Sequence, residues 1–305
     1  APSAADMGSN SIASVSGIMK AIFKRETRSY FTSVVGYVII AATFAFIALY
    51  YAANNLIYGS PDFAVVLYST LLVMLFILPA LSMRSFADER RNKTDQLLLT
   101  SPVSIPAIVL GKYLAQLAVF AVPVALAAVL PLTMGLFGTV SYVSAYAALF
   151  GYFLAGAACI AVGTFVSALT ENQILSYLAT FAVLLVCYMM NSIQTLFTSG
   201  NTMAFIAFGI VLAVAAVLVG LLCKTVTAGS PVFCVGAAAL VLLFRLRPAW
   251  LLEAFDAVLD ALALFDPFLD FVGGMFTISG VVYYFSVIAL FLFLTGQALE
   301  RRRWN

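Results

Sequence analysis

The sequence has no histidine and very little charge. Among its 305 residues, Asp, Glu, Lys and Arg make up 9% and hydrophobic residues 64%, and the mean hydropathy is +1.09. A soluble domain is about half apolar and a quarter charged. So few charged side chains cannot give this apolar mass a water-facing surface, so the excess must face lipid. This excludes a soluble globular enzyme.

The missing histidine and the placement of cysteine also limit the chemistry of the chain. Histidine is the commonest metal ligand and the commonest acid–base group near neutral pH. The cysteines lie in apolar stretches without CxxC spacing, which is typical of small buried hydrophobic residues: Cys159, Cys187, Cys223 and Cys234. Gly111-Lys112 lacks the upstream glycine of a nucleotide-binding loop. We therefore expect no metal, no cofactor and no nucleic-acid partner for this chain.

Long apolar segments recur along the chain. About 20 residues cross the roughly 30 Å of a bilayer's hydrocarbon core. Eight segments approach or exceed this length: Val34–Tyr51, Phe63–Met83, Ala107–Leu130, Tyr142–Leu169, Ile174–Ile193, Met203–Cys223, Val226–Leu246 and Thr277–Leu299. The sequence therefore predicts an all-α polytopic membrane protein with about eight transmembrane helices, or six if 203–246 is re-entrant.

The basic residues indicate how these spans are oriented, because cytoplasmic loops carry an excess of Lys and Arg. With the N-terminus in the cytoplasm and eight crossings, thirteen of these residues fall inside and only Arg245 and Arg247 outside. Six crossings give twelve against three, so the rule does not decide between the two numbers. We expect a multi-pass protein of the plasma (cytoplasmic) membrane with both termini inside.

Residues 1–18 lack the basic and apolar regions of a signal peptide, so we expect a tag remnant or a disordered lead, followed by one membrane domain over 19–305. Residues 19–33 predict an amphipathic elbow helix before the first span. Its apolar and basic side chains fall on opposite faces: Met19, Ile22, Phe23 and Tyr30 against Lys20, Lys24, Arg25 and Arg28. Glu26 interrupts the apolar stripe, either as a solvated carboxylate or as a functional one.

A second amphipathic region, within 250–274, is expected on the outer surface. Its acidic face consists of Glu253, Asp256 and Asp260. Asp266-Pro267 predicts a helix start and Gly273-Gly274 a helix end. Two interfacial helices would result, whose acidic residues either shield the outer mouth or bind a cation or substrate.

The one strongly polar stretch in the body of the chain, Arg84–Pro102, predicts a cytoplasmic helix hairpin. Ser85 and Asp88 have the spacing of a capping box, and Glu89 and Lys93 that of a helical ion pair. Its tip carries three leucines in a row: Leu97, Leu98 and Leu99. Exposed leucines need a cover, and physical reasoning alone leaves lipid and a partner protein equally open.

The elbow, this hairpin and the C-terminal segment 283–304 resemble the permease subunit of the type-2 ABC exporter family, and its gliding-motility-associated branch in particular. The hairpin is similar to the family's pattern at these positions: Glu89, Thr94, Leu97, Leu98, Ser101 and Pro102. Lys93 stands where that pattern has glycine. The likeness covers Met19 to about Leu136 and Phe265 to Trp304.

The resemblance implies a non-catalytic subunit that forms the substrate path of an ATP-driven exporter. It would pair with a second copy or with a related permease that has an extracytoplasmic domain, above ATPase subunits that bind ATP and Mg. The residues implied in ATPase coupling lie on the hairpin and the elbow: Glu89, Arg90, Thr94, Leu97, Leu98 and Leu99, with Lys24, Arg25 and Glu26. We add the hypothesis that Glu26 pairs with Arg84 or Arg90. A membrane scaffold or a secondary transporter without an ATPase is the alternative.

The first prediction concerns topology. Single cysteines in a cysteine-free background should react with an impermeant reagent from outside when placed at Asp62 or Asp256, and only from inside when placed at Lys93, because of the charge asymmetry. Labelling of position 224 from outside would contradict the eight-span version and favour a re-entrant segment over 203–246.

Overall fold

The computed structural model describes residues 4–93, 104–136, 138–197, 253 and 257–303. All regular structure in these residues is helical. Contacts divide the chain into two compact units: unit 1 is Ala1–Leu185 with Pro267–Asn305, and unit 2 is Val186–Asp266. The all-α fold class is confirmed, whereas the single membrane domain over 19–305 stays a prediction.

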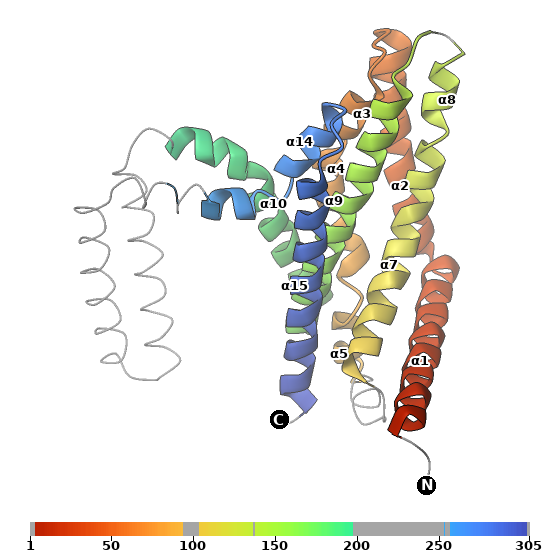
Figure 1. Ribbon diagram of the computed structural model, residues 1–305, viewed down its shortest axis with the longest axis vertical. Helices are drawn as coiled ribbons and strands as arrows, with labels where there is room; N and C mark the ends of the chain where they lie inside the picture. Colours follow the sequence, from red (N-terminus) through yellow and green to blue (C-terminus); the bar gives the residue numbers. More distant parts are fainter. Residues whose placement is uncertain (1–3, 94–103, 137, 198–252, 254–256, 304–305) are drawn as a thin grey trace, which may run out of the picture. The chain divides into compact units, whose positions relative to one another are not determined.

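The helices can be followed along the chain in Figure 1. They are α1 (Ala4–Thr32), α2 (Val34–Tyr51) with its π-helical extension η1 (Ala52–Ile57), α3 (Phe63–Ser69), α4 (Leu71–Ser82), α5 (Ala87–Arg91), α7 (Ile105–Ala127), α8 (Leu130–Met134), α9 (Tyr142–Leu169), α10 (Gln173–Phe197), α14 (Asp266–Val272) and α15 (Ile278–Arg303).

Six helical stretches are long and apolar enough to cross a membrane, among the residues that the structure describes: Val34–Ile57, Leu71–Arg91, Ile105–Met134, Tyr142–Leu169, Gln173–Met190 and Ile278–Arg303. Each overlaps one of six segments that the sequence predicts, and the largest difference is Leu71–Arg91 against the predicted Phe63–Met83. The other two, within 203–246, lie outside the described residues. The chain is thus a multi-pass membrane protein, and the choice between six and eight spans stays a prediction.

Helix α1 is longer than the expected elbow. It begins at Ala4, so residues 4–18 are helical, which differs from a disordered lead, and the alternative of a tag remnant stays a prediction. Its amphipathic half ends where the sequence predicts, since Ser33 adopts an extended conformation and its Oγ accepts a hydrogen bond from Val35 N (3.3 Å) to cap α2. Ile22 is buried, and Lys20 and Lys24 are exposed.

Two of the predicted spans are interrupted. The backbone leaves ideal α-helical geometry at Thr70 (φ −84°, ψ −6°), which separates α3 from α4. Helix α7 continues through Pro123 and ends at Ala127, and α8 then carries Pro131 in its first turn. Proline fits a first turn because its missing N–H has no helical partner there.

Helix α9 lies inside the bundle. Of its most apolar stretch, 78% is buried, against 17–56% for the other candidate spans. Its small residues allow close approach: an added Cβ at Gly151 would meet Phe271 of α14 at 2.7 Å, and one at Gly163 would meet the Cβ of Ser82 on α4 at 2.7 Å. These glycines therefore pack within the chain.

The acidic region predicted over 250–274 is described in part. Helix α14 begins at Asp266 and ends before Gly273-Gly274, as its sequence predicts, with Gly274 in the left-handed region (φ +75°). Glu253 and Asp260 are exposed. Asp256 lies outside the described residues.

The second prediction tests this packing with two glycines that differ in surroundings. Gly163→Ala should lower stability by about 1–3 kcal/mol, because the rigid Cβ of Ser82 must move. Gly296→Ala, on α15 with open space around the added Cβ, should leave stability unchanged or raise it by up to about 1 kcal/mol. Thermal unfolding in detergent measures both, and equal effects would contradict the packing argument.

Candidate functional site

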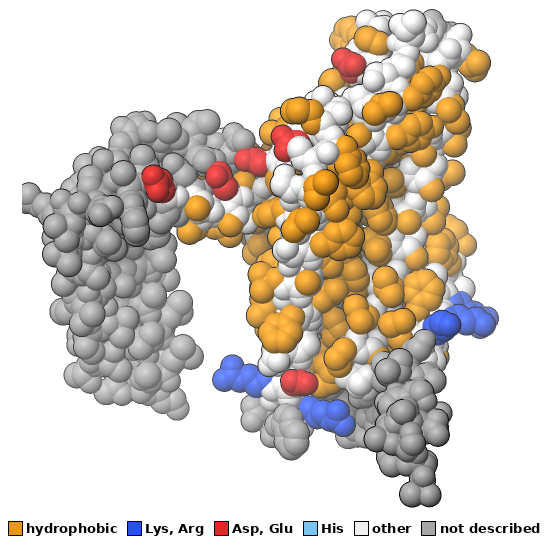
Figure 2. All heavy atoms as spheres, viewed as in Figure 1, with side chains coloured by type: hydrophobic (Ala, Val, Ile, Leu, Met, Phe, Trp, Pro, Cys, Tyr) orange, Lys and Arg blue, Asp and Glu red, His pale blue; other side chains and the backbone are white. Residues whose placement is uncertain are grey.

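The basic residues of unit 1 gather at one end. The described Lys and Arg residues lie there; the other three of the chain's 15, Lys224, Arg245 and Arg247, are outside the described residues. Figure 2 shows the same segregation on one face, with apolar side chains over the body and blue side chains toward the lower end. Helix α5, the start of α7 and the ends of α9 and α15 meet at this end (Figure 1).

Lys112 on α7 is the centre of a charged cluster at this end. Its side chain is 2% exposed, and its Nζ lies 3.3 Å from Oε1 of Glu26 on α1 and 2.9 Å from Oε1 of Glu89 on α5. The same Nζ donates a hydrogen bond to the carbonyl oxygen of Ser85 (2.9 Å) and lies 5.2 Å from the ring centre of Phe86. One ammonium group thus joins three helices.

Arg25 adds a second, more exposed cation to this cluster. Its guanidinium lies 2.7 Å from Glu26 and 3.2 Å from Glu89, with the side chain 57% exposed. An ion pair this accessible to water contributes at most about 1 kcal/mol. The buried contacts of Lys112 therefore carry most of the link between α1 and α5.

Glu26 is ionised at neutral pH despite its burial. Burial alone would raise the pKa of its carboxyl, but the charge of Lys112 and the hydrogen bond and charge of Arg25 outweigh this and hold the pKa below its ordinary value of 4.5. A lowered folded-state pKa stabilises the fold above the unfolded-state value, so this contribution is complete above about pH 4.5 and is lost as the pH falls further.

Polar contacts hold α5 from its other side. The Oγ of Ser167 on α9 accepts hydrogen bonds from the backbone N–H groups of Phe86 and Ala87, both at 3.1 Å, and donates one to the carbonyl oxygen of Met83 (3.1 Å). Arg90 donates a 2.6 Å hydrogen bond to the carbonyl oxygen of Ala168 at the end of α9. The short helix is therefore anchored between α7 and α9.

An apolar cluster lies beneath these charges. It consists of buried residues from α1, α7, α9 and α15 together with the residue before α5: Ile22, Phe86, Ile105, Ile108, Val109, Ala168 and Leu299. Gly111 allows α1 to pack closely against α7, because a Cβ at this position would meet the side chain of Ile22 at 2.9 Å. The cluster keeps water from the inner side of the ion pairs, where charges interact more strongly.

One predicted ion pair and one predicted helix cap are wrong. Glu26 pairs with Lys112 and Arg25 and not with Arg84 or Arg90, since Arg84 lies 3.4 Å from Asp88 and Arg90 bonds to Ala168. Helix α5 begins at Ala87 without a side-chain cap, so Ser85 does not form the capping box. Its Oγ accepts a hydrogen bond from the buried Gln116 instead (3.0 Å).

Lys93 takes a glycine-like conformation after α5. Its φ is +56°, in the left-handed region, and its N–H bonds to the carbonyl oxygen of Arg90 (3.1 Å). Helices commonly end with a left-handed residue, usually glycine. The turn expected of a glycine at this position is thus retained with lysine.

The structure brings together only part of the predicted coupling set. Arg25, Glu26, Glu89 and Arg90 take part in the contacts above, and Lys24 is exposed. Four other members lie outside the described residues: Thr94, Leu97, Leu98 and Leu99. Sequence reasoning missed Lys112, Gln116 and Ser167. The signal for Lys112 was a lone lysine one to two turns inside an apolar span, where an unpaired cation is costly.

Comparison with known families gives one match. Residues 53–203 match the model of the ABC-2 family transporter protein, a stretch that includes α5 and Lys112. No curated protein and no solved structure matches the chain. The family match and the six spans support an ABC-2 type permease, the membrane component of a transporter.

The third prediction concerns Lys112. Lys112→Met should destabilise the protein by about 1–3 kcal/mol, because two half-buried carboxylates lose their buried cation and keep only the exposed Arg25 beside them. Adding Glu26→Gln should recover part of this loss, since one of the two charges is then gone. Lys24→Met, an exposed lysine on the same helix as Glu26, is the control and should change stability by less than about 0.5 kcal/mol. Equal losses for the two lysines in thermal unfolding would show that the cluster is not stabilising.

Proposed function

We propose that this chain is the membrane-spanning permease subunit of an ATP-driven ABC exporter, which forms the substrate path and is moved by a separate ATPase subunit. The match of residues 53–203 to the ABC-2 family transporter protein carries this proposal. The six candidate spans agree with it. In the described spans charged residues lie only near the helix ends, so they offer no midplane relay of the kind that an ion-coupled transporter uses.

We place the coupling to the ATPase at α5 and the segment 94–102 that follows it. Lys112 ties α5 to α7 and α1, and Ser167 ties it to α9. A force applied to 94–102 by a partner would therefore act on the elbow helix α1 and on the third and fourth spans together. The leucines Leu97, Leu98 and Leu99 supply the apolar contact for that partner.

The finer features of the proposal follow from charge and resemblance. The basic end of unit 1 faces the cytoplasm, where positive residues are enriched, and both termini lie on that side. The chain pairs with a second copy or with a related permease that has an extracytoplasmic domain, as in the gliding-motility-associated branch. A membrane scaffold or secondary transporter is the competing function.

The fourth prediction tests the coupling segment. The chain with both Leu97→Asp and Leu98→Asp should lose the ABC ATPase that co-purifies with it in mild detergent, because charged side chains cannot enter an apolar groove without a desolvation cost. Leu136→Asp is a matched control: Leu136 is an 81% exposed leucine in a loop at the opposite end of unit 1, and its replacement should retain the ATPase.

Two outcomes would contradict different parts of this account. If the doubly substituted chain keeps its ATPase and its transport activity, then lipid covers the leucines and coupling lies elsewhere. If the unaltered chain co-purifies with no ABC ATPase and its membranes show no ATP-dependent transport, then the scaffold or secondary-transporter alternative replaces the exporter.

A further inference from the structure

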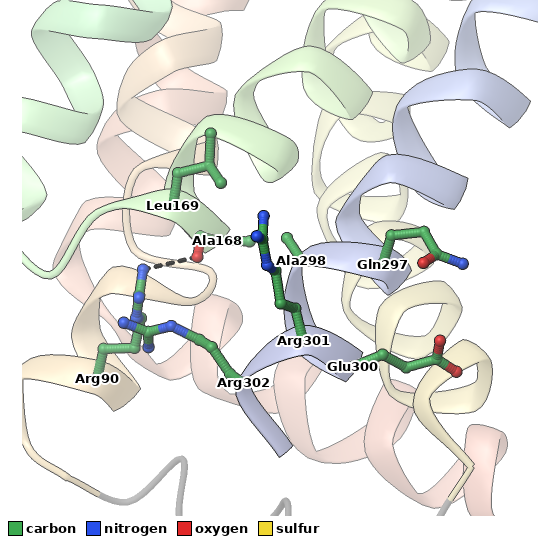
Figure 3. A pocket seen from close by; sticks show the side chains of 8 residues that line it. All are labelled: Arg90, Ala168, Leu169, Gln297, Ala298, Glu300, Arg301 and Arg302. Carbon is green, nitrogen blue, oxygen red and sulfur yellow. Dashed lines mark hydrogen bonds between the residues drawn. The ribbon is translucent and has the colours of Figure 1, made fainter. Parts of the chain in front are cut away.

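A pocket of about 810 Å³ opens between α5, α9 and α15 at the basic end of unit 1. Three arginines line it: Arg90 from α5, and Arg301 and Arg302 from the end of α15. In the view of Figure 3, Arg301 and Arg302 extend toward the side of Arg90, whereas Glu300 extends to the other side of α15. Arg302 also forms an ion pair with Glu171 (3.2 Å), so the excess of positive charge in this pocket comes mainly from Arg90 and Arg301.

Arg90 is the strongest sign that the pocket is built to hold an anion. It is 8% exposed, its Nη1 bonds to Ala168, and its buried Nε has no acceptor within the part of the chain that the structure describes. A buried donor without an acceptor is costly, and more so on a charged group. A guanidinium group matches phosphate oxygens in geometry and charge.

An apolar track leads along α15 to the same pocket. Leu290 and Phe293 are 54% and 63% exposed, and with Gln297, which lines the pocket, they follow the i, i+3, i+7 spacing of one helix face. In a membrane such side chains contact acyl chains. A ligand that fits both the apolar track and the arginine-lined pocket has a hydrocarbon chain for the first and an anionic group for the second.

We propose that this pocket binds the phosphate of an anionic phospholipid headgroup, with its acyl chains along Leu290 and Phe293. Because Arg90 belongs to α5, the bound lipid also braces α5 against α15. This inference rests on the pocket and not on the transport function proposed above, so either can fail alone. A free phosphate ion would satisfy the same arginines, and the test below separates it from a lipid.

The fifth prediction measures lipid selectivity in nanodiscs that mix phosphatidylcholine with phosphatidylglycerol. Wild-type protein should retain phosphatidylglycerol in mass spectra after transfer to detergent. Joint replacement by Arg301→Gln and Arg302→Gln should weaken this retention about 25-fold, given roughly a fivefold loss for each basic residue removed. Arg301→Gln alone should give an intermediate loss. Arg303→Gln removes the same charge from the same helix but outside the pocket, and should change retention less than about twofold.

The midpoint of thermal unfolding in detergent is an independent measurement of lipid binding. Added phosphatidylglycerol should raise the midpoint of the wild type and of the Arg303→Gln variant, and should do so far less for the doubly substituted one. Equal retention of phosphatidylglycerol by all variants would overturn the proposal, since the pocket would then not select the lipid. A rise in the midpoint produced equally by inorganic phosphate without lipid would overturn the assignment to a headgroup and identify a free-anion site.

Discussion

The buried ammonium group of Lys112 is the interaction on which the basic end of the molecule depends. A lone cation inside an apolar helix bundle is strongly unfavourable, so its two carboxylate partners must stay in place. Those partners, Glu26 and Glu89, lie on α1 and α5. The constraint therefore holds three helices at one point, and the apolar cluster around Ile22 and Phe86 packs against it.

Much of the fold follows from local patterns in the sequence. The length of an apolar segment and the position of turn residues depend on neighbours along the chain, so the six described spans and the bounds of α14 could be predicted. The apolar and basic faces of the elbow helix could also be predicted from helical periodicity. The extension of α1 back to Ala4 could not, because the Ala/Ser/Gly-rich composition there indicates no particular structure.

The partners within the charged cluster could not be predicted in the same way. Helix α5 has only five residues, and a rotation of one residue turns Arg90 toward α1 in place of Glu89. Tertiary packing decides that rotation, through hydrogen bonds that the N–H groups of Phe86 and Ala87 donate to Ser167 and that no local pattern reveals. Lys112 was missed for a related reason: a lysine near a span end is usually explained by its long side chain reaching the headgroups.

The break at Thr70 distinguishes two neighbouring helices mechanically. Helix α9 is continuous over 28 residues and behaves as a rod, so a tilt at one end displaces the other. The α3–α4 pair instead has a joint where the backbone departs from helical geometry. Since α4 packs closely against α9 through Ser82 and Gly163, a movement transmitted through α5 would be shared by α4 and α9, and Thr70 is the point at which the second predicted span can bend. The bundle thus combines one continuous transmembrane helix, α9, with a neighbouring one that is bent at Thr70.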